Sequence, residues 1–303
     1  MNLQKGETSV RPSAIKRFAS SLIREYISRF PVAKGKWFLQ TKIGVTFLVA
    51  QLDSGPWIRV SGVSGFEWAA FFKLSKELKS RDLVLGFLKS GMTFFDIGAN
   101  IGYFTLTASP RVGNGAVHAF EPTPVLAERI RLNTKLNGFH NITVCEAAVS
   151  NFDGEMQLHI CQDDSEGNSL VLFESDWPSI SVNTIQLDSY IEKHPIESID
   201  LIKIDCEGAE LFVLQGASRL LARNDSPVIM VEINPSTLKA ADIKTIDIFN
   251  YLRLFHYQIF LIEELKSGEN PVNNMLAVRE SHLTKYPILT NYCLNQFSIS
   301  EDT

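Results

Sequence analysis

The chain has 303 residues, of which 45% are hydrophobic and 21% are charged, as is typical of a soluble globular domain with an extension. Its formal net charge of -5 gives no electrostatic footprint for binding bulk nucleic acid, although a local basic patch is not excluded. No stretch reaches the ~18 apolar residues of a membrane span, and the four cysteines form no Cys-x-x-Cys pair, so we expect a cytoplasmic protein with reduced thiols.

We divide the chain into an N-terminal extension (1–80), a main domain (81–285) and a C-terminal tail (286–303). From 14 to 30, apolar residues recur at spacings of three and four, which predicts an amphipathic helix that ends at Pro31. Its polar face is rich in Lys and Arg, as in membrane-surface helices. A homodimer contact through this extension is also open, but we favour a helix that packs on the main domain.

A small hairpin and two helices lead into the main domain. Residues 42–52 and 57–60 read as strands joined by a turn-rich Asp-Ser-Gly-Pro link. Helices are expected over 68–78 and 82–89. The hairpin thus precedes these helices and the main fold in the sequence.

The stretch from Thr93 to Gly102 reads Thr-Phe-Phe-Asp-Ile-Gly-Ala-Asn-Ile-Gly. A short apolar strand stops at Asp96, a glycine turn follows, and apolar residues then recur at helical spacing from 101 to 108. Glycine lets the backbone approach a ligand, and a helix start offers unpaired N–H groups. This order predicts a nucleotide-type site at the carboxyl edge of a parallel sheet, with an ordinary strand–helix turn as the alternative.

A second strand over 116–120 ends at Glu121-Pro122. An acid at this place, about 20 residues past the glycines, is suited to accept both hydroxyls of a ribose. The preceding turn lacks the Gly-x-Gly-x-x-Gly spacing, and Asp96 would repel a phosphate but suits a cationic amino-acid portion. The combination favours S-adenosylmethionine as the ligand, with a solvated strand-end acid as the bland alternative for Glu121.

The rest of the chain alternates strands and helices. We expect strands over 142–149, 156–161, 182–187, 199–204, 227–233, 257–262 and 275–278, and helices over 123–137, 210–221 and 236–255. This order predicts an α/β fold with a doubly wound, mostly parallel sheet. Ala147 and Ala148 leave room for an adenine ring or simply pack in a crowded sheet. The polar loop 162–181 is a flap or a disordered excursion.

Four ordered motifs resemble the FkbM family of S-adenosylmethionine-dependent methyltransferases. They are Asp96-Ile-Gly-Ala-Asn-Ile-Gly102, Phe120-Glu-Pro122, Ala147-Ala-Val-Ser150 and Lys203-Ile-Asp-Cys-Glu-Gly-Ala-Glu210. The resemblance runs from about Gly65 to Arg279. It implies a class I, Rossmann-like methyltransferase with a seven-stranded sheet. It also implies that the enzyme acts on oxygen, with a sugar, polyketide or other small molecule as acceptor. It also implies that Glu67 contacts the cofactor and that the flap residues Asn168 and Ser169 contact the substrate.

With the turn and strand-end residues, the expected cofactor site comprises Glu67, Asp96, Gly98, Ala99, Asn100, Gly102, Glu121, Pro122, Ala147 and Ala148. We expect Glu207 to contact the substrate. Asp205, after the fourth strand, is our first candidate for a general base or an acceptor-orienting group, and Glu232 is the second. Lys203 lies in a strand that should be buried, so it must face a partner or a cavity. It either holds Asp205 ionised or binds the acceptor oxygen, unless the two form a structural ion pair.

Three further alternatives stay open. Asp205, Glu207 and Glu232 could instead bind Mg²⁺, which would acidify a hydroxyl, but we do not favour a metal. His159 could act as a base, although a structural role is preferred. The rival functions are a non-catalytic S-adenosylmethionine-binding or scaffold protein and a nicotinamide-dependent oxidoreductase, which the turn at Asp96 disfavours.

Overall fold

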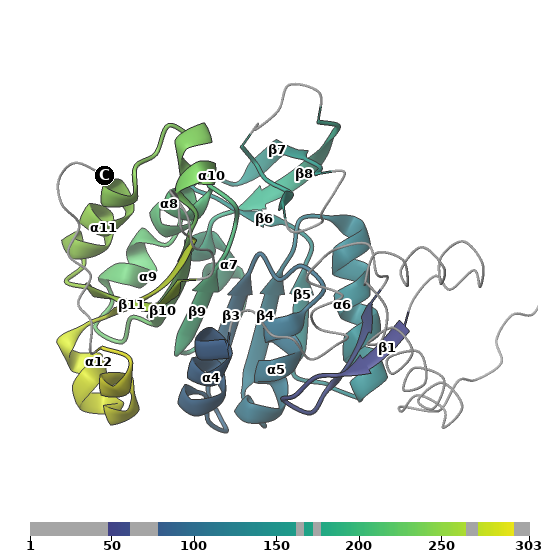
Figure 1. The fold of residues 1–303 in the computed structure, drawn as a ribbon, viewed down its shortest axis with the longest axis horizontal. Helices are drawn as coiled ribbons and strands as arrows, with labels where there is room; N and C mark the ends of the chain where they lie inside the picture. Colours follow the sequence, from purple (N-terminus) through teal and green to yellow (C-terminus); the bar gives the residue numbers. More distant parts are fainter. Residues whose placement is uncertain (1–47, 61–77, 162–166, 172–176, 265–271, 294–303) are drawn as a thin grey trace, which may run out of the picture.

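The computed structural model describes residues 48–60, 78–161, 167–171, 177–264 and 272–293, whose arrangement is shown in Figure 1. The helix predicted over 14–30 and the predicted cofactor contact Glu67 lie outside these residues.

A seven-stranded sheet forms the centre of the molecule, in the order β11-β12-β10-β9-β3-β4-β5. Its strands are β3 (Thr93–Ile97), β4 (Ala116–Phe120), β5 (Ile142–Cys145), β9 (Leu201–Ile204), β10 (Val228–Ile233), β11 (Gln258–Glu264) and β12 (Asn273–Val278). The five strands from β10 to β5 run parallel, and β12 is antiparallel to both of its neighbours. The prediction of a doubly wound, mostly parallel sheet is confirmed. The carboxyl ends of five strands therefore meet at one edge.

Helices cover both faces of this sheet (Figure 1). They are α4 (Leu78–Phe87), α5 (Tyr103–Val112), α6 (Pro124–Asn137), α7 (Leu187–Lys193), α8 (Glu210–Gln215), α9 (Ser218–Ala222), α10 (Pro235–Ala240), α11 (Thr245–Leu254) and α12 (Glu280–Lys285), with a final 3₁₀ turn η2 (Pro287–Asn291). Neighbouring residues of a strand enter opposite cores, because side chains alternate across a sheet. Phe94 and Leu201 pack with α4 and α5, whereas Phe95 and Ile202 pack with α7 to α11. Both faces are apolar, as a buried parallel sheet requires.

A smaller sheet stands over the carboxyl edge of the large one, at the top of Figure 1. It consists of β6 (Ala148–Val149), β8 (Ser179–Ile185) and β7 (Gly154–His159), in that order. The prediction of a single strand over 142–149 is wrong, because this stretch forms two strands in different sheets. The chain leaves the main sheet after Cys145, and Ala148 then pairs with Thr184 of β8.

The predicted hairpin is confirmed where the structure describes it, as β1 (Leu48–Gln51) and β2 (Trp57–Val60). Its second strand is held by two carboxamides of α6. Asn133 Oδ1 accepts from the Arg59 N–H at 2.8 Å, and Asn137 bonds both the N–H and the carbonyl of Trp57 at 2.6 Å. These bonds satisfy an otherwise open strand edge.

Two helices predicted as continuous are each broken. The chain between α8 and α9 passes so close to another backbone that a Cβ on Gly216 would lie 2.0 Å from the Ser150 carbonyl oxygen. The chain between α10 and α11 turns at Asp242, whose φ is 57°. Periodicity does not reveal these breaks, because apolar spacing continues across them.

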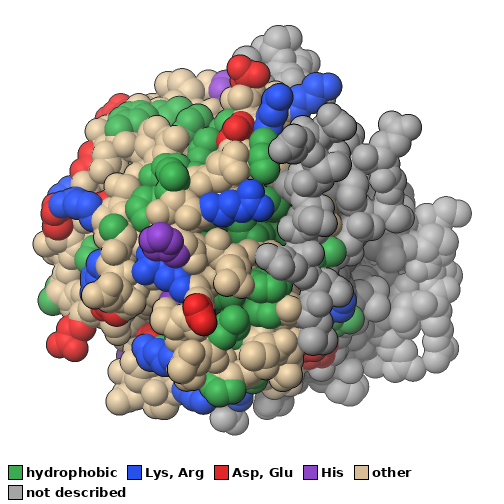
Figure 2. Space-filling view, turned by 90° about the vertical axis from the view of Figure 1, so that its left-hand side faces the viewer, with side chains coloured by type: hydrophobic (Ala, Val, Ile, Leu, Met, Phe, Trp, Pro, Cys, Tyr) green, Lys and Arg blue, Asp and Glu red, His purple; other side chains and the backbone are tan. Residues whose placement is uncertain are grey.

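On the face shown in Figure 2, acidic, basic and apolar side chains are interspersed. Within the described part of the chain, no helix combines the length and the apolar character needed to cross a membrane.

Candidate active site

A pocket of about 540 Å³, including part of its open mouth, lies between the ends of β3, β4 and β9 and the small sheet. Open α/β sheets bind ligands at this edge, because loops and helix N-termini converge there. The residues that the sequence singles out are therefore expected to lie at this pocket.

The turn after β3 packs tightly under the end of β9. Gly98 has a φ of 76°, and a Cβ there would lie 1.8 Å from the Asp205 carbonyl oxygen. The N–H groups of Gly98 and Ala99 both donate to the Phe120 carbonyl oxygen at 3.1 Å. Gly102, with a φ of 87°, precedes α5. The turn thus joins the backbones of three strands where a side chain has no room.

Glu121 is a buried acid in the pocket wall. Its Oε2 accepts from the Asn100 N–H and its Oε1 from the Thr123 N–H, both at 2.9 Å. Burial raises the pKa of Glu121 to about 7, and these hydrogen bonds offset part of that rise. Each oxygen keeps a further lone pair, so the carboxylate can still accept hydrogen bonds from a ligand.

Behind the turn, Lys203 connects two acids. It lies opposite Asp96 in the parallel register, and its Nζ donates to Asp205 Oδ2 at 2.7 Å and lies 4.9 Å from the centroid of the Phe104 ring. Asp96 Oδ2 accepts from Thr105 Oγ1 at 2.6 Å. Burial raises the pKa of Asp96, and the charge of Lys203 opposes this effect. The prediction that Lys203 must face a partner is confirmed.

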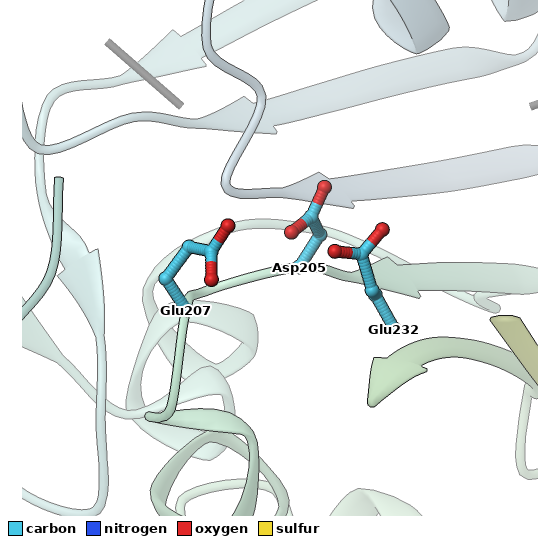
Figure 3. Close-up of side chains that lie close together, drawn as sticks. All are labelled: Asp205, Glu207 and Glu232. Atoms are coloured by element: carbon cyan, nitrogen blue, oxygen red, sulfur yellow. The ribbon is translucent and has the colours of Figure 1, made fainter. Parts of the chain in front are cut away.

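Three carboxylates gather at the ends of β9 and β10. Asp205, Glu207 and Glu232 each offer one oxygen within 4.8 Å of the others, and Figure 3 shows the three side chains turned toward a common space. Asn234 Nδ2 donates to Glu207 Oε2 at 3.1 Å. Glu207 adopts a φ of 48°, a left-handed conformation that is uncommon for residues other than glycine and that is often found at functional sites.

A fourth acid shapes the loop that carries this cluster. Glu210 Oε1 accepts from the N–H groups of Cys206 and Gly208 at 3.1 Å. Gly208 in turn packs against α10, where a Cβ would lie 2.8 Å from the Thr237 carbonyl oxygen. Glu210 is buried, and burial raises its pKa to about 7. It supports the loop from within.

The described part of the flap folds back over the pocket. His159 and Ser169 exchange backbone hydrogen bonds at 2.8 and 3.0 Å, and Asn168 Oδ1 accepts from the Cys161 N–H at 3.0 Å. Ser169 Oγ donates to the Glu207 carbonyl oxygen at 2.6 Å. The side chain of His159 has a buried Nδ1 without a hydrogen-bond partner. The flap and the acidic loop are thus joined directly.

The structure brings most of the predicted site residues to one pocket. Lining the pocket are Gly98, Asn100, Glu121, Pro122, Ala147, Ala148, Asn168, Ser169, Asp205 and Glu207. Outside the wall lie Asp96, Ala99, Gly102, Lys203 and Glu232. Asp96 is set back because β3 continues to Ile97, past the expected stop, and its side chain is 1% exposed.

Other wall residues gave no usable signal in the sequence. Leu158 and Leu170 come from the small sheet and the flap, and only tertiary folding brings them to the pocket. Asn234 does not line the pocket but bonds Glu207, and it follows Glu232 by two residues at the end of a strand. That spacing places both side chains on one side and could have been used.

The sequence profile of the methyltransferase FkbM domain matches residues 96–259, which is more than half of the chain. The chain is 28% identical over 168 residues to the 2-O-methyltransferase NoeI of Sinorhizobium fredii, covering 50% of this chain and 68% of that protein. It is 27% identical over 159 residues to the 31-O-demethyl-FK506 methyltransferase FkbM of Streptomyces tacrolimicus, covering 43% and 60%. It is 27% identical over 127 residues to the hexuronic acid methyltransferase AglP of Haloferax volcanii, covering 42% and 50%.

The chain thus spans about half to two thirds of the length of these relatives. The profile begins at Asp96 and ends at the start of β11, so it includes the glycine turn, Glu121 and the carboxylate cluster. The four quoted motifs all lie within it, and the strand order is that of the Rossmann-like class I methyltransferase fold. The chain therefore belongs to the FkbM family of methyltransferases, whose cofactor is S-adenosylmethionine.

Proposed function

We propose that the protein transfers the methyl group of S-adenosylmethionine to a hydroxyl oxygen of a small-molecule or glycan acceptor. The observation that carries this proposal is a single pocket with Glu121 in one wall and Asp205 in another. The oxygen preference is supported by two relatives whose names state O-methylation. The acceptor class is supported by relatives named for FK506 and for hexuronic acid.

The chemistry of the wall fits the cofactor. Glu121 is suited to hold the ribose hydroxyls, because its carboxylate is fixed by two backbone N–H groups and retains acceptor capacity. Ala147 and Ala148, both small, leave space for the adenine. Asp96 is buried behind the turn and outside the pocket lining, so we assign it to favour the cationic amino-acid portion from a distance rather than by contact. These assignments follow the sequence prediction, and each can be tested by substituting the residue.

When bound, S-adenosylmethionine supplies a methyl group on a sulfonium. An acceptor lone pair forms the new C–O bond, the C–S electron pair goes to sulfur, and the hydroxyl proton is released. Asp205 lies in the wall with one oxygen fixed by Lys203. We assign Asp205 to orienting the acceptor hydroxyl and taking its proton, with Glu232 as the second carboxylate at hand. Glu207, Asn168 and Ser169 are assigned to contacting the acceptor.

Transfer of a labelled methyl group tests this function. The full chain is incubated with S-adenosylmethionine carrying a tritiated methyl group and with a panel of sugars, hexuronic acids and polyketide alcohols. We expect label in at least one hydroxylated acceptor, and none in the analogue that lacks that hydroxyl. Label on nitrogen or carbon instead would overturn the oxygen assignment. Tight binding of NADH without binding of S-adenosylmethionine would overturn the function altogether.

We also propose that the protein works in the cytoplasm, with a homodimer contact through residues 1–80 as the alternative to a helix that packs on the main domain, and that it does not bind bulk nucleic acid. The net charge of -5 and the free cysteines Cys145, Cys161, Cys206 and Cys293 support the first and last points. Light scattering of the full chain, with and without duplex RNA, measures the oligomeric state and the binding of RNA. A monomeric mass would rule out the homodimer contact. A mass increase with RNA would contradict the proposal that the protein does not bind nucleic acid.

A further inference from the structure

We propose that Asp205, Glu207 and Glu232 bind a hard divalent cation of the Mg²⁺, Mn²⁺ or Ca²⁺ type at the acceptor side of the pocket. Each residue presents a carboxylate oxygen within 4.8 Å of the other two, and all three side chains are partly buried. Figure 3 shows them facing the same space. The donors are all carboxylates, which suits hard cations rather than zinc or copper.

The spacing fits such an ion. Oxygens bound to Mg²⁺ at about 2.0–2.1 Å can lie up to about 4.2 Å apart, so small side-chain rotations bring these three to coordination distance. Pairs of oxygens bound to Ca²⁺ at about 2.3–2.6 Å can lie up to about 4.6–5.2 Å apart, so the upper limit of 4.8 Å on the three separations requires less adjustment for Ca²⁺ than for Mg²⁺. The cluster thus has room for one ion of this class without a change in the backbone.

The side chains of Asp205 and Glu232 leave the same face of the sheet. In β10, Met230 faces the core formed with α4 and α5, so Glu232, two residues on, faces the same way. In β9, Leu201 enters that core, which places Lys203 and then Asp205 on this face as well. The carboxylates are therefore neighbours because of the register of β9 and β10, in which Ile204 pairs with Val231.

A second observation on the neighbouring strand points to a ligand. Asn274 pairs directly with Glu232 across β10 and β12, so the two side chains stand next to each other on one face. Leu276, two residues on, enters the same core as Met230 and confirms the orientation. Asn274 is 1% exposed, and its Nδ2 is buried without a hydrogen-bond partner. A buried amide N–H normally has a partner, so this one is explained by an oxygen that the ion carries.

A cation at this place would also narrow the acceptor class, a point that rests on the proposed function. Asp205 and Glu207 line the pocket, so the ion would reach the acceptor oxygen and make its proton easier to remove. An acceptor with two adjacent oxygens, such as a vicinal diol or a hydroxy acid, would bind the ion through both.

Electron paramagnetic resonance with Mn²⁺ tests the site without reference to turnover. Free Mn²⁺ gives a strong signal that is lost on binding, and we expect the full chain to take up one ion. Glu232→Gln is expected to weaken Mn²⁺ binding by at least about tenfold. Asn274→Asp adds a carboxylate beside Glu232 and is expected to tighten it. The matched control is Glu155→Gln, an exposed acid of β7, which should bind Mn²⁺ like the unchanged chain.

Binding of S-adenosylhomocysteine, measured in EDTA, reports in each variant whether the fold and the cofactor site are intact. Variants that bind it normally while the unchanged chain takes up no Mn²⁺ would overturn the cation site and leave the methyltransferase in place. Equal Mn²⁺ binding by the unchanged chain and Glu232→Gln would do the same. If the unchanged chain did not bind S-adenosylhomocysteine, that result would instead count against the proposed function.

Discussion

The two sides of the pocket are built differently. On the side of β3 and β4, Glu121 is 5% exposed and both of its oxygens are fixed by backbone N–H groups of adjoining turns. On the side of β9 and β10, the carboxylates of Asp205, Glu207 and Glu232 are only partly buried. Those of Asp205 and Glu207 accept from the side chains of Lys203 and Asn234, and the flap bonds only the backbone carbonyl of Glu207. The first arrangement suits one invariant ligand. The second leaves freedom to accommodate an acceptor and its proton, so we expect substitutions on the two sides to separate binding from turnover.

Lys203 links the two sides, and its loss should have the largest effect. Lys203→Met leaves the buried Asp96 and the adjoining Asp205 without their cation, which is expected to cost about 3–5 kcal/mol of unfolding free energy. Urea denaturation measures this loss. Adding Asp96→Asn should restore much of it, because the buried charge is removed. A double variant as unstable as Lys203→Met would contradict the electrostatic explanation.

Asp205→Asn should separate the sides most clearly. The carboxamide still accepts from Lys203 but cannot take a proton, so we expect turnover to fall by about 10²–10⁴-fold. The affinity for S-adenosylhomocysteine should change little. Single-turnover methyl transfer and calorimetry check the two halves of this prediction. A turnover near that of the unchanged chain would exclude Asp205 as the base.

Gly98→Ala should damage the side of β3 and β4. A Cβ there would lie 1.8 Å from the Asp205 carbonyl oxygen at a φ of 76°, and we expect a loss of about 2–4 kcal/mol in unfolding free energy. Gly55→Ala is the matched control, since Gly55 also has a positive φ, 109°, but nothing lies within 4 Å of the added atom. Urea denaturation should show a clearly smaller loss for the control, and equal losses would mean that the close approach does not matter.

Glu121 should give the smallest effect, one that depends on pH. Because burial raises the pKa of Glu121 to about 7, the folded chain holds this proton more tightly than the unfolded chain. Its contribution to stability is therefore fully present below about pH 4.5 and is lost as the pH rises toward 7. Affinity for S-adenosylhomocysteine should change in the opposite direction, increasing by up to about tenfold per pH unit between 6 and 7 as the carboxylate ionises. Glu121→Gln should flatten both profiles, and a slope kept in that variant would assign it to another group.

The side of β3 and β4 was largely predictable from the sequence because its signals are local. The glycine turn at Gly98 and the acid at Glu121 lie at strand ends that composition reveals. The depth of Asp96 was not predictable, since it depends on how far β3 runs and on the opposing Lys203. The position of Ala148 in a second sheet was not predictable either, because it depends on pairing with Thr184.

The side of β9 and β10 was predictable only in part. Strand ends located Asp205 and Glu232, but their proximity to Glu207 depends on a loop shaped by buried hydrogen bonds to Glu210. Asn274 had no signal of its own, because only the register of β12 places it beside Glu232. Register between distant strands is a tertiary property that period-two patterning does not specify.

Calorimetric titration with S-adenosylhomocysteine, on the unchanged chain, Glu121→Ala and Asp205→Asn in parallel, tests the division of the pocket most directly. We predict that Glu121→Ala weakens binding by about 1.5–3 kcal/mol, as for a lost hydrogen bond to a charged group. Asp205→Asn should leave the affinity nearly unchanged. Binding that is indifferent to Glu121, or equally weakened by both substitutions, would contradict the assignment of one side to the cofactor and the other to the acceptor.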